Sequence, residues 1–306
     1  MNSKLSVGRC AVAVLMLVLA LPCMAAAPRV LNDDVHFAEG PVWHDGQLYY
    51  VEYDRNTVDA WDGHSNRIVA TLPGCGPSAV IVRPSGEFYV TCYDSNSIGR
   101  LSATGVALPA LDHDRDGHKF SGPNDFAADA AGGLYFTGSG HPGTAIDGQL
   151  FYLAADGTIT QVASALNAAN GVALSRDGKT LYLIETEAHH LLRYQVGAPG
   201  HISGRSVFLD LDQLMHRIGH FWPDGVKIDS RGQIYIGQNP RDPGAPLAGM
   251  IFVVNESGRL LRTLSLPSPG VPNLAFSPDE RTVYVTALDQ LDKSPYRGKL
   301  YAIDNP

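Results

Sequence analysis

Four residues with side-chain oxygen atoms recur at equivalent places in the sequence and could together bind a metal ion. They are Glu39, Asn124, Asn170 and Asp224, and each stands next to a glycine or a proline at the expected start of a strand. Carboxylate and amide oxygens are hard donors that suit Ca²⁺; Mg²⁺, Mn²⁺ and Zn²⁺ are the alternatives, with zinc the poorest match. The residue types therefore predict a divalent-metal site.

The two acidic members give this prediction an electrostatic reason. If Glu39 and Asp224 were buried together without a cation they would repel each other, and one of them would have to bind a proton. A divalent ion removes that cost and leaves coordination positions open. The alternative is that the four side chains only cap strand ends by accepting hydrogen bonds from backbone amides.

The elements that must bring these residues together are six repeated β-hairpins. Each consists of a short apolar run, a turn and a second apolar run, and a further strand candidate follows it. The residues that begin the first strands are 39, 46, 46, 54 and 49 positions apart: Glu39, Ser78, Asn124, Asn170, Asp224 and Asn273. Such a period is typical of β-propeller blades. We therefore expect an all-β fold, a six-bladed propeller with four-stranded blades and a divalent ion in its central channel, rather than a sandwich or a solenoid.

The two ends of the chain are expected to close this ring. KLYAID (299–304) would be the third strand of the last blade, and RVLNDD (29–34) its outer fourth strand. One short helix is expected over 210–218. No Pro- or Ser-rich linker divides the chain, so residues 26–306 are predicted to form a single domain.

Residues 1–25 have the layout of a secretory signal peptide. Lys4 and Arg9 precede an apolar run over 11–21, and small residues follow. The run is too short to span a bilayer, which takes about 20 residues; the alternative is a buried N-terminal helix. We expect a periplasmic or secreted protein. The mature chain would keep only Cys75 and Cys92, which could form a disulfide or remain two buried thiols.

Composition limits the partners. The 306 residues are 44% hydrophobic and 18% charged, with a formal net charge of −8. This charge argues against a nucleic-acid partner, which requires a basic face. The mean hydropathy of −0.06 excludes a multi-span membrane protein, and no membrane span is expected. A small molecule is the expected partner, and the sequence leaves the oligomeric state open.

The sequence resembles the senescence marker protein/gluconolactonase/luciferin-regenerating-enzyme-like family across the mature chain. The resemblance is carried by AEGPVW (38–43), GPND (122–125), NGVALSRDGKTLY (170–182) and PDGVKID (223–229). It implies a six-bladed propeller with one divalent ion, Glu39, Asn170 and Asp224 as ligands, and Asn124 beside them, touching metal or substrate. Gly122 departs from the arginine found there in some members that act on sugar lactones, and Lys119 stands where a related pattern often has arginine.

Many proteins of this family hydrolyse lactones, so we expect a Ca²⁺-dependent, gluconolactonase-like hydrolase of a lactone or related ester. Such a reaction needs a polarised carbonyl, a positioned water and stabilisation of the tetrahedral intermediate. Asn124 could donate to a substrate oxygen. Asp224 could act as a general base, orient the water or attack as a nucleophile. The alternative is a non-catalytic propeller that binds a small ligand or a protein, with a structural ion.

Other residues are weaker candidates. Lys119, His141, His220 and Asn273 could contact the substrate. DHDRDG (112–117) opens like a calcium loop, but Pro123 occupies the position that an EF-hand gives to glutamate. It is either a second calcium site or a solvated acidic loop. GxSxG, HExxH and P-loop motifs are absent from the sequence.

Overall fold

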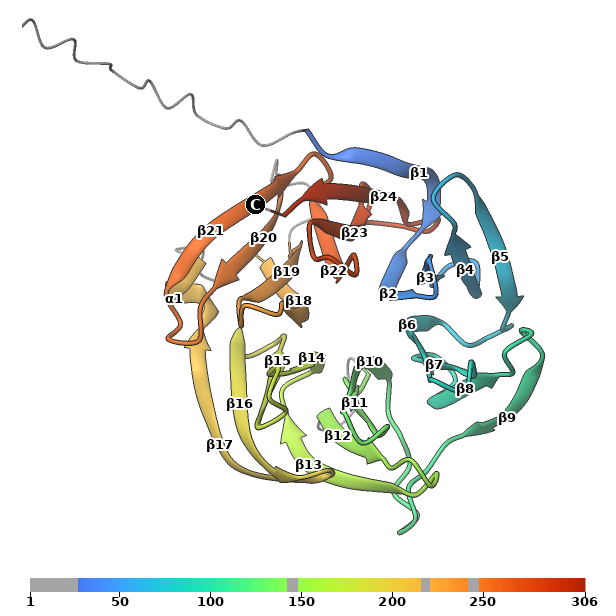
Figure 1. Cartoon of the computed structure of the whole chain (residues 1–306), viewed down its shortest axis with the longest axis vertical. Helices are drawn as coiled ribbons and strands as arrows, with labels where there is room; N and C mark the ends of the chain where they lie inside the picture. The colour runs from blue at the N-terminus through green and yellow to red at the C-terminus, as the bar shows by residue number, and fades with distance from the viewer. Residues whose placement is uncertain (1–26, 142–147, 216–220, 242–247, 306) are drawn as a thin grey trace, which may run out of the picture.

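A computed structural model describes residues 27–141, 148–215, 221–241 and 248–305 of the chain. Within these residues the protein is all-β, and its sheets are set around a central axis (Figure 1). The only helix in the described part is α1, Leu211–Met215, which agrees with the expected short helix. No described helix is long and apolar enough to cross a membrane. The predicted signal peptide, residues 1–25, lies outside the described residues.

Four antiparallel sheets of four strands follow one another along the chain. The first contains β2 Ala38–His44, β3 Gln47–Glu52, β4 Thr57–Trp61 and β5 Asn66–Thr71. The second contains β6 Pro77–Val82, β7 Phe88–Cys92, β8 Ser97–Leu101 and β9 Ala107–Leu111. The third contains β10 Pro123–Ala128, β11 Leu134–Gly138, β12 Gly148–Leu153 and β13 Ile159–Leu166. The fourth contains β14 Ala169–Leu174, β15 Thr180–Glu185, β16 His190–Ala198 and β17 His201–Asp210.

The remaining strands form one sheet of eight. One part contains β18 Phe221–Ile228, β19 Ile234–Pro240, β20 Gly249–Val254 and β21 Leu260–Leu266. The other contains β22 Gly270–Phe276, β23 Thr282–Leu288, β24 Arg297–Asp304 and β1 Arg29–His36. A pairing of β19 with β22, opposite Gln238 and Val271, joins the two parts.

The N-terminal strand closes the ring, as the sequence predicts. In the antiparallel pairing of β1 with β24, Arg29 lies opposite Ala302 and Val30 opposite Tyr301. Both ends of the chain are thereby held in one sheet, so the first and last parts of the fold cannot separate without breaking this ladder.

Apolar side chains from neighbouring sheets pack against one another and hold the sheets in place. In one cluster, Tyr182 and Leu191 of the fourth sheet contact Ile236 and Phe252 of the next. Both faces of the middle strands are therefore covered, which explains why strands such as β3 are apolar without strict alternation. The outer strand β5 is largely exposed.

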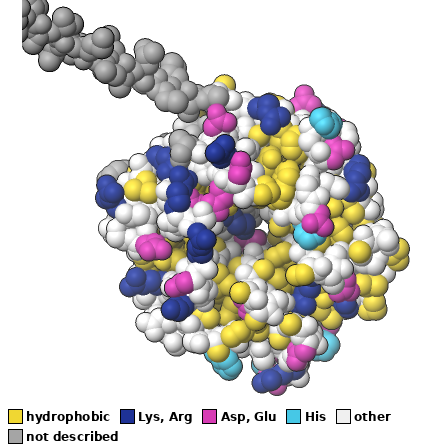
Figure 2. All heavy atoms as spheres, in the orientation of Figure 1, with side chains coloured by type: hydrophobic (Ala, Val, Ile, Leu, Met, Phe, Trp, Pro, Cys, Tyr) yellow, Lys and Arg dark blue, Asp and Glu magenta, His cyan; other side chains and the backbone are white. Residues whose placement is uncertain are grey.

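The first strand of each group lies nearest the axis. In Figure 1, β2, β6, β10, β14, β18 and β22 surround the centre, and β5, β9, β13, β17, β21 and β1 lie at the perimeter. The face drawn in Figure 2 is hollowed at its centre, and hydrophobic side chains gather around the hollow. The six inner strands are the ones that the repeat predicts to carry the functional residues.

Candidate metal centre and active site

The four predicted oxygen donors come together. Glu39 of β2, Asn124 of β10, Asn170 of β14 and Asp224 of β18 all line one cavity of about 270 Å³. The cavity is completed by Phe37, Tyr53, Ser78, Tyr93 and Tyr296. We call this space the donor cavity. Residues more than 180 positions apart in the chain thus meet at the axis, as the repeat predicts.

A register irregularity in each inner strand accompanies these side chains. Shifts occur over 39–42 in β2, 77–79 in β6, 123–126 in β10, 169–172 in β14, 223–226 in β18 and 270–273 in β22. Each shift includes the residue at the repeat position. A β-bulge redirects the side chain at which it occurs and is common beside active sites. The bulges therefore direct side chains from different strands toward the axis.

Close backbone contact between β14 and β18 explains the glycine beside Asn170. A Cβ atom on Gly171 would lie 2.5 Å from the carbonyl oxygen of Asp224. Any other residue would push the two strands apart. The absence of a side chain at Gly171 thus keeps Asn170 and Asp224 next to each other.

Threonines near the end of the second strands, or just after one, hold the inner strands of the next sheet. Their Oγ1 atoms donate to backbone carbonyls: Thr91 to Asn124 at 2.6 Å, Thr137 to Asn170 at 2.7 Å and Thr186 to Pro223 at 2.8 Å. These positioning residues were not predicted from the sequence. The available signal was a threonine in VTC (90–92) and FTG (136–138), at the same place of the second run; Thr186 in IET (184–186) comes just after its run.

Burial and like charge make the two acids of the donor cavity hard to ionise together. Burial raises the pKa of Glu39 well above its usual value, and the nearby Asp224 raises it further. Burial also raises the pKa of Asp224 to about 7, with Asp125 adding to the effect. Asn239, which the sequence analysis also missed, donates to Asp224 Oδ2 at 2.6 Å and orients that carboxylate.

The donor set fits a hard divalent cation. Asn170 Nδ2 donates to Thr186 Oγ1 at 3.2 Å, whereas the buried Asn170 Oδ1 has no hydrogen-bond partner among the described residues. A buried acceptor without a partner is costly, and a cation would satisfy it. Two carboxylates and an amide oxygen could hold Ca²⁺ and leave room for water or substrate.

The same inner strands form a second cavity at the other end of the channel. It has a volume of about 330 Å³ and is lined by later residues of these strands, including Asp125 and Lys227. Lys227 Nζ donates to Asp125 Oδ2 at 2.7 Å, and the two side chains are 20% and 4% exposed. The two members of this buried pair act in opposite directions on the donor cavity: Asp125 raises the pKa of both Glu39 and Asp224, and Lys227 lowers it.

The weaker candidates lie elsewhere or outside the described residues. Lys119 is largely exposed and pairs with Asp112 at 2.5 Å. Asn273 is buried, and its Oδ1 accepts a hydrogen bond from the Leu274 amide at 2.9 Å. His141 bonds Asn96 Oδ1 at 2.8 Å and packs against the ring of Tyr93. None of these three is among the described lining of the donor cavity, and His220 falls outside the described residues.

Cys75 and Cys92 are joined by a disulfide, one of the two states that the sequence left open. The hairpin register places Cys92 opposite Pro77, as expected from the turn between β6 and β7. Cys75 precedes that strand by two residues, which brings its Cα atom to 4.5 Å from that of Cys92.

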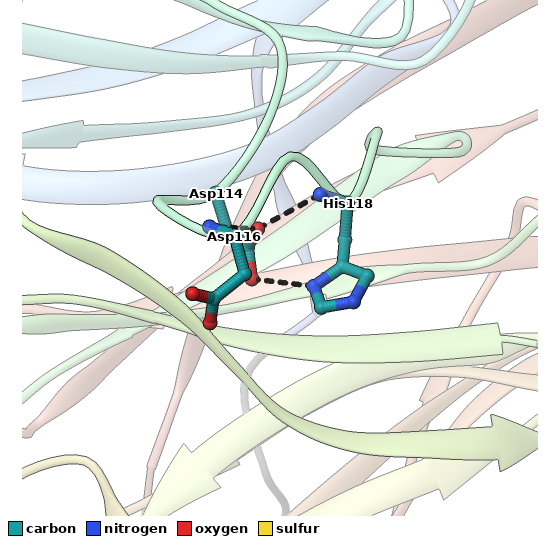
Figure 3. A group of neighbouring side chains, drawn as sticks. All are labelled: Asp114, Asp116 and His118. Atoms are coloured by element: carbon teal, nitrogen blue, oxygen red, sulfur yellow. Dashed lines mark hydrogen bonds and ion pairs between the residues drawn. The ribbon is translucent and has the colours of Figure 1, made fainter.

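The acidic loop forms a small cluster away from the donor cavity. Ligand atoms of Asp114, Asp116 and His118 lie within 4.8 Å of one another, which an ion could bridge. Asp114, however, already accepts bonds from the Asp116 and His118 amides and from the His118 ring (Figure 3). It also accepts a bond from the Gln161 amide. These bonds lower the pKa of Asp114 despite its burial. The hydrogen bonds to Asp114 stabilise the loop and explain why this carboxylate is buried, without an ion.

Comparisons with known proteins point to one family. A family model described as the SMP-30/Gluconolactonase/LRE-like region matches residues 37–289. The chain is 28% identical to pentonolactonase XacC of Haloferax volcanii over 267 residues, which cover 84% of each protein. It is 27% identical to regucalcin of Sus scrofa, covering 90% of this chain and 92% of the relative.

Solved structures agree on the fold. A gluconolactonase from Xanthomonas campestris superposes with a TM-score of 0.71 at 19% identity, covering 93% of this chain and 96% of that chain. The family match spans most of the sequence and includes all four donors of the cavity. The chain therefore belongs to the SMP-30/gluconolactonase/LRE-like family.

Proposed function

We propose that this protein is a six-bladed β-propeller with one divalent cation, Ca²⁺ by preference, in its channel. In this interpretation the eight-stranded sheet is two blades, β18–β21 and β22–β24 with β1, which meet at the pairing of Gln238 with Val271. Glu39, Asn170 and Asp224 would hold the ion, with Asn124 beside it. The donor chemistry and the orphaned oxygen of Asn170 support this arrangement.

We propose that its activity is hydrolysis of a lactone or a related ester. The observation that carries this proposal is the convergence of four oxygen-bearing side chains in a cavity large enough for a small molecule. Relatives named pentonolactonase, gluconolactonase and regucalcin support the same reaction class. Mg²⁺, Mn²⁺ and Zn²⁺ are the alternative ions.

The chain's own residues would position both reactants. Asn124 Nδ2 would donate a hydrogen bond to a substrate oxygen, and Asp224, oriented by Asn239, would accept a proton from water or align that water. Water adds to the carbonyl carbon, the acyl C–O bond breaks, and the leaving oxygen takes a proton, which gives a hydroxy acid. A bound divalent cation would polarise the carbonyl and lower the pKa of a nearby water.

We also propose that the protein acts in the periplasm or outside the cell after removal of residues 1–25. The disulfide between Cys75 and Cys92 supports this location, because such bonds persist in oxidising compartments.

The activity can be tested by titrating acid release from a panel of lactones at constant pH, with Ca²⁺ and with EDTA. We expect turnover with Ca²⁺, its loss in EDTA and its loss in Asp224→Ala. Asp116→Asn is the matched control, because it removes an exposed carboxylate of the acidic loop. If no lactone is hydrolysed with any divalent ion, the proposed activity is wrong. If Asp224→Ala keeps full metal-dependent turnover, the assigned site is wrong.

A further inference from the structure

Four aromatic rings line the donor cavity. Phe37, Tyr53, Tyr93 and Tyr296 all line it and are all partly exposed. Phe37 lies between β1 and β2, Tyr53 follows β3, Tyr93 follows β7 and Tyr296 immediately precedes β24. The ring centroid of Phe37 lies 5.4 Å from that of Tyr53 and 5.6 Å from that of Tyr296. We call these four residues the aromatic collar.

Backbone and side-chain contacts fix the collar before any ligand binds. The Phe37 amide donates to the Tyr296 carbonyl at 2.7 Å, and the Tyr53 amide donates to the Phe37 carbonyl at 3.0 Å. The Tyr53 hydroxyl donates to Asp94 Oδ1 at 2.9 Å. Three of the rings are thus tied together across β1, β3 and β24. A rigid aromatic surface costs little entropy when a ligand packs against it.

Tyr93 is held from another side. Its ring packs edge-on against His141 with centroids 4.6 Å apart. Gly122 has a φ of 54°, and a Cβ atom there would lie 2.8 Å from the Tyr93 ring. The backbone just before Asn124 therefore packs directly against Tyr93, and no side chain at Gly122 could enter the cavity without displacing that ring.

The lining of the cavity combines polar and aromatic side chains. Glu39, Ser78, Asn124, Asn170 and Asp224 supply polar side chains, while the collar supplies four aromatic rings, three of which carry a hydroxyl. Burial raises the pKa of Tyr53 and of Tyr93, so both hydroxyls stay neutral. A polyhydroxylated sugar ring would find no Lys or Arg among the described lining residues, whereas a flat apolar group can stack on the collar rings.

We propose that the substrate is an aryl lactone or aryl ester, with its ring on the aromatic collar and its carbonyl at the oxygen donors. This proposal rests on the proposed hydrolase function and names its substrate class. The cavity of about 270 Å³ lies close to the lower end of small-molecule sites, at about 300 Å³, which suits a small bicyclic lactone. The polar and apolar halves of such a molecule match the polar side chains and the aromatic rings of the lining.

Hydrolysis of this substrate class is chemically consistent with the site. Water adds to the carbonyl carbon, the bond between that carbon and the aryl oxygen breaks, and the electron pair leaves on the phenolate. A phenol has a pKa of about 10, like the tyrosine side chain. The phenolate can therefore leave without a proton from the protein and take one from solvent.

The test compares three lactones in Ca²⁺ at constant pH: dihydrocoumarin as the aryl lactone, gluconolactone as the sugar lactone and delta-valerolactone as the unsubstituted ring. We expect kcat/KM for dihydrocoumarin to exceed that for gluconolactone at least tenfold. Phe37→Ala and Tyr296→Ala should each lower kcat/KM for dihydrocoumarin about tenfold, mainly through KM, because a stacked ring contributes about 1 kcal/mol or more. Turnover of delta-valerolactone should change less than about twofold, because this lactone has no aryl ring to stack on the collar. A twofold change corresponds to under about 0.5 kcal/mol.

Ile81→Ala is the matched control, because Ile81 lines the second cavity at the other end of the channel. Its three kcat/KM values should keep the wild-type ratios. Preference for gluconolactone, or an equal loss on all three lactones in Phe37→Ala, would overturn the proposed substrate class while leaving the hydrolase function intact.

Absence of all turnover would instead refute the hydrolase function. The collar is then tested by calorimetric titration with the lactam analogue of dihydrocoumarin, which resists hydrolysis. Binding that weakens about tenfold in Phe37→Ala supports the collar as an aryl-binding surface, and unchanged binding or no binding overturns it.

Discussion

Replacing Asp224 with asparagine should have opposite effects on stability with and without calcium. Burial, with a contribution from Asp125, raises the pKa of Asp224 from 3.8 to about 7. Such an acid favours the folded state at low pH, and this contribution is lost as the pH rises from the unfolded to the folded pKa. About three pKa units correspond to at most about 4 kcal/mol at pH 8. Asp224→Asn has no carboxyl to titrate, but its amide still has to be buried. We therefore expect the variant to regain about half of the lost stability, roughly 2 kcal/mol.

The assay is urea unfolding of the wild type and Asp224→Asn at pH 8 and pH 5, in EDTA and in Ca²⁺. In EDTA at pH 8 the variant should be more stable by about 2 kcal/mol, and at pH 5 this advantage should shrink. Calcium at about 100 times its Kd should stabilise the wild type by about 2.7 kcal/mol, and the variant should gain less than about 1 kcal/mol because one charged ligand is missing. If the variant is equally destabilised in EDTA and in Ca²⁺, Asp224 serves as a structural hydrogen-bond acceptor and the reasoning is wrong.

Three further predictions concern the scaffold, and each is measured as the free energy of unfolding in urea. Lys227→Met should lose about 3 kcal/mol because it leaves Asp125 buried without its cation; Asp125→Asn added to it should restore more than half, and simple additivity would contradict a direct pair. Cys75→Ser with Cys92→Ser should lose about 3 kcal/mol, because the disulfide closes a loop of 17 residues; dithiothreitol should lower the wild type to the same stability and leave the variant unchanged, and a variant much less stable than the reduced wild type would point to packing instead. Burial, with Asp59, raises the pKa of Glu52 from 4.5 to about 7, so stability should fall by up to about 3 kcal/mol as the pH rises through this range; Glu52→Gln should flatten that fall, and an unchanged pH profile would refute it.

Much of the fold follows from the sequence because its repeat is local. Each hairpin combines an apolar run, a turn and a second run, so the β2–β3 and β14–β15 pairings form as their spacing predicts. The closing pairing of β1 with β24 follows because only one strand remains after the last hairpin, so the N-terminal strand has to supply the fourth strand of that blade. The eight-stranded sheet was not anticipated, because the contact of Gln238 with Val271 depends on how two neighbouring sheets meet.

The donors of the site were predictable for the same reason, since Glu39, Asn124, Asn170 and Asp224 share one phase of the repeat. Asn273 shares that phase and accepts a bond from the Leu274 amide, as Glu39 does from the Gly40 amide, but only Glu39 lines the donor cavity. Lys119 was matched by its place before GPND, but the loop carries it outward to Asp112.

Only part of the aromatic collar could be read from the sequence. Tyr53 and Tyr93 stand at one equivalent place of the repeat, in VEYDRN (51–56) and TCYDSN (91–96), whereas no repeat connects Phe37 and Tyr296 with them. Only the assembled sheets bring all four to one cavity. If the proposed substrate class is right, the connections between strands set substrate preference, while the repeat sets the oxygen donors.

Anomalous diffraction from crystals grown with Mn²⁺, and then with Ca²⁺, tests most directly whether a cation binds at the axis. We predict one strong peak in the donor cavity, about 2.0–2.6 Å from oxygen atoms of Glu39, Asn170 and Asp224. A protein whose only peak lies at Asp114, Asp116 and His118, with none in the donor cavity, would contradict the account.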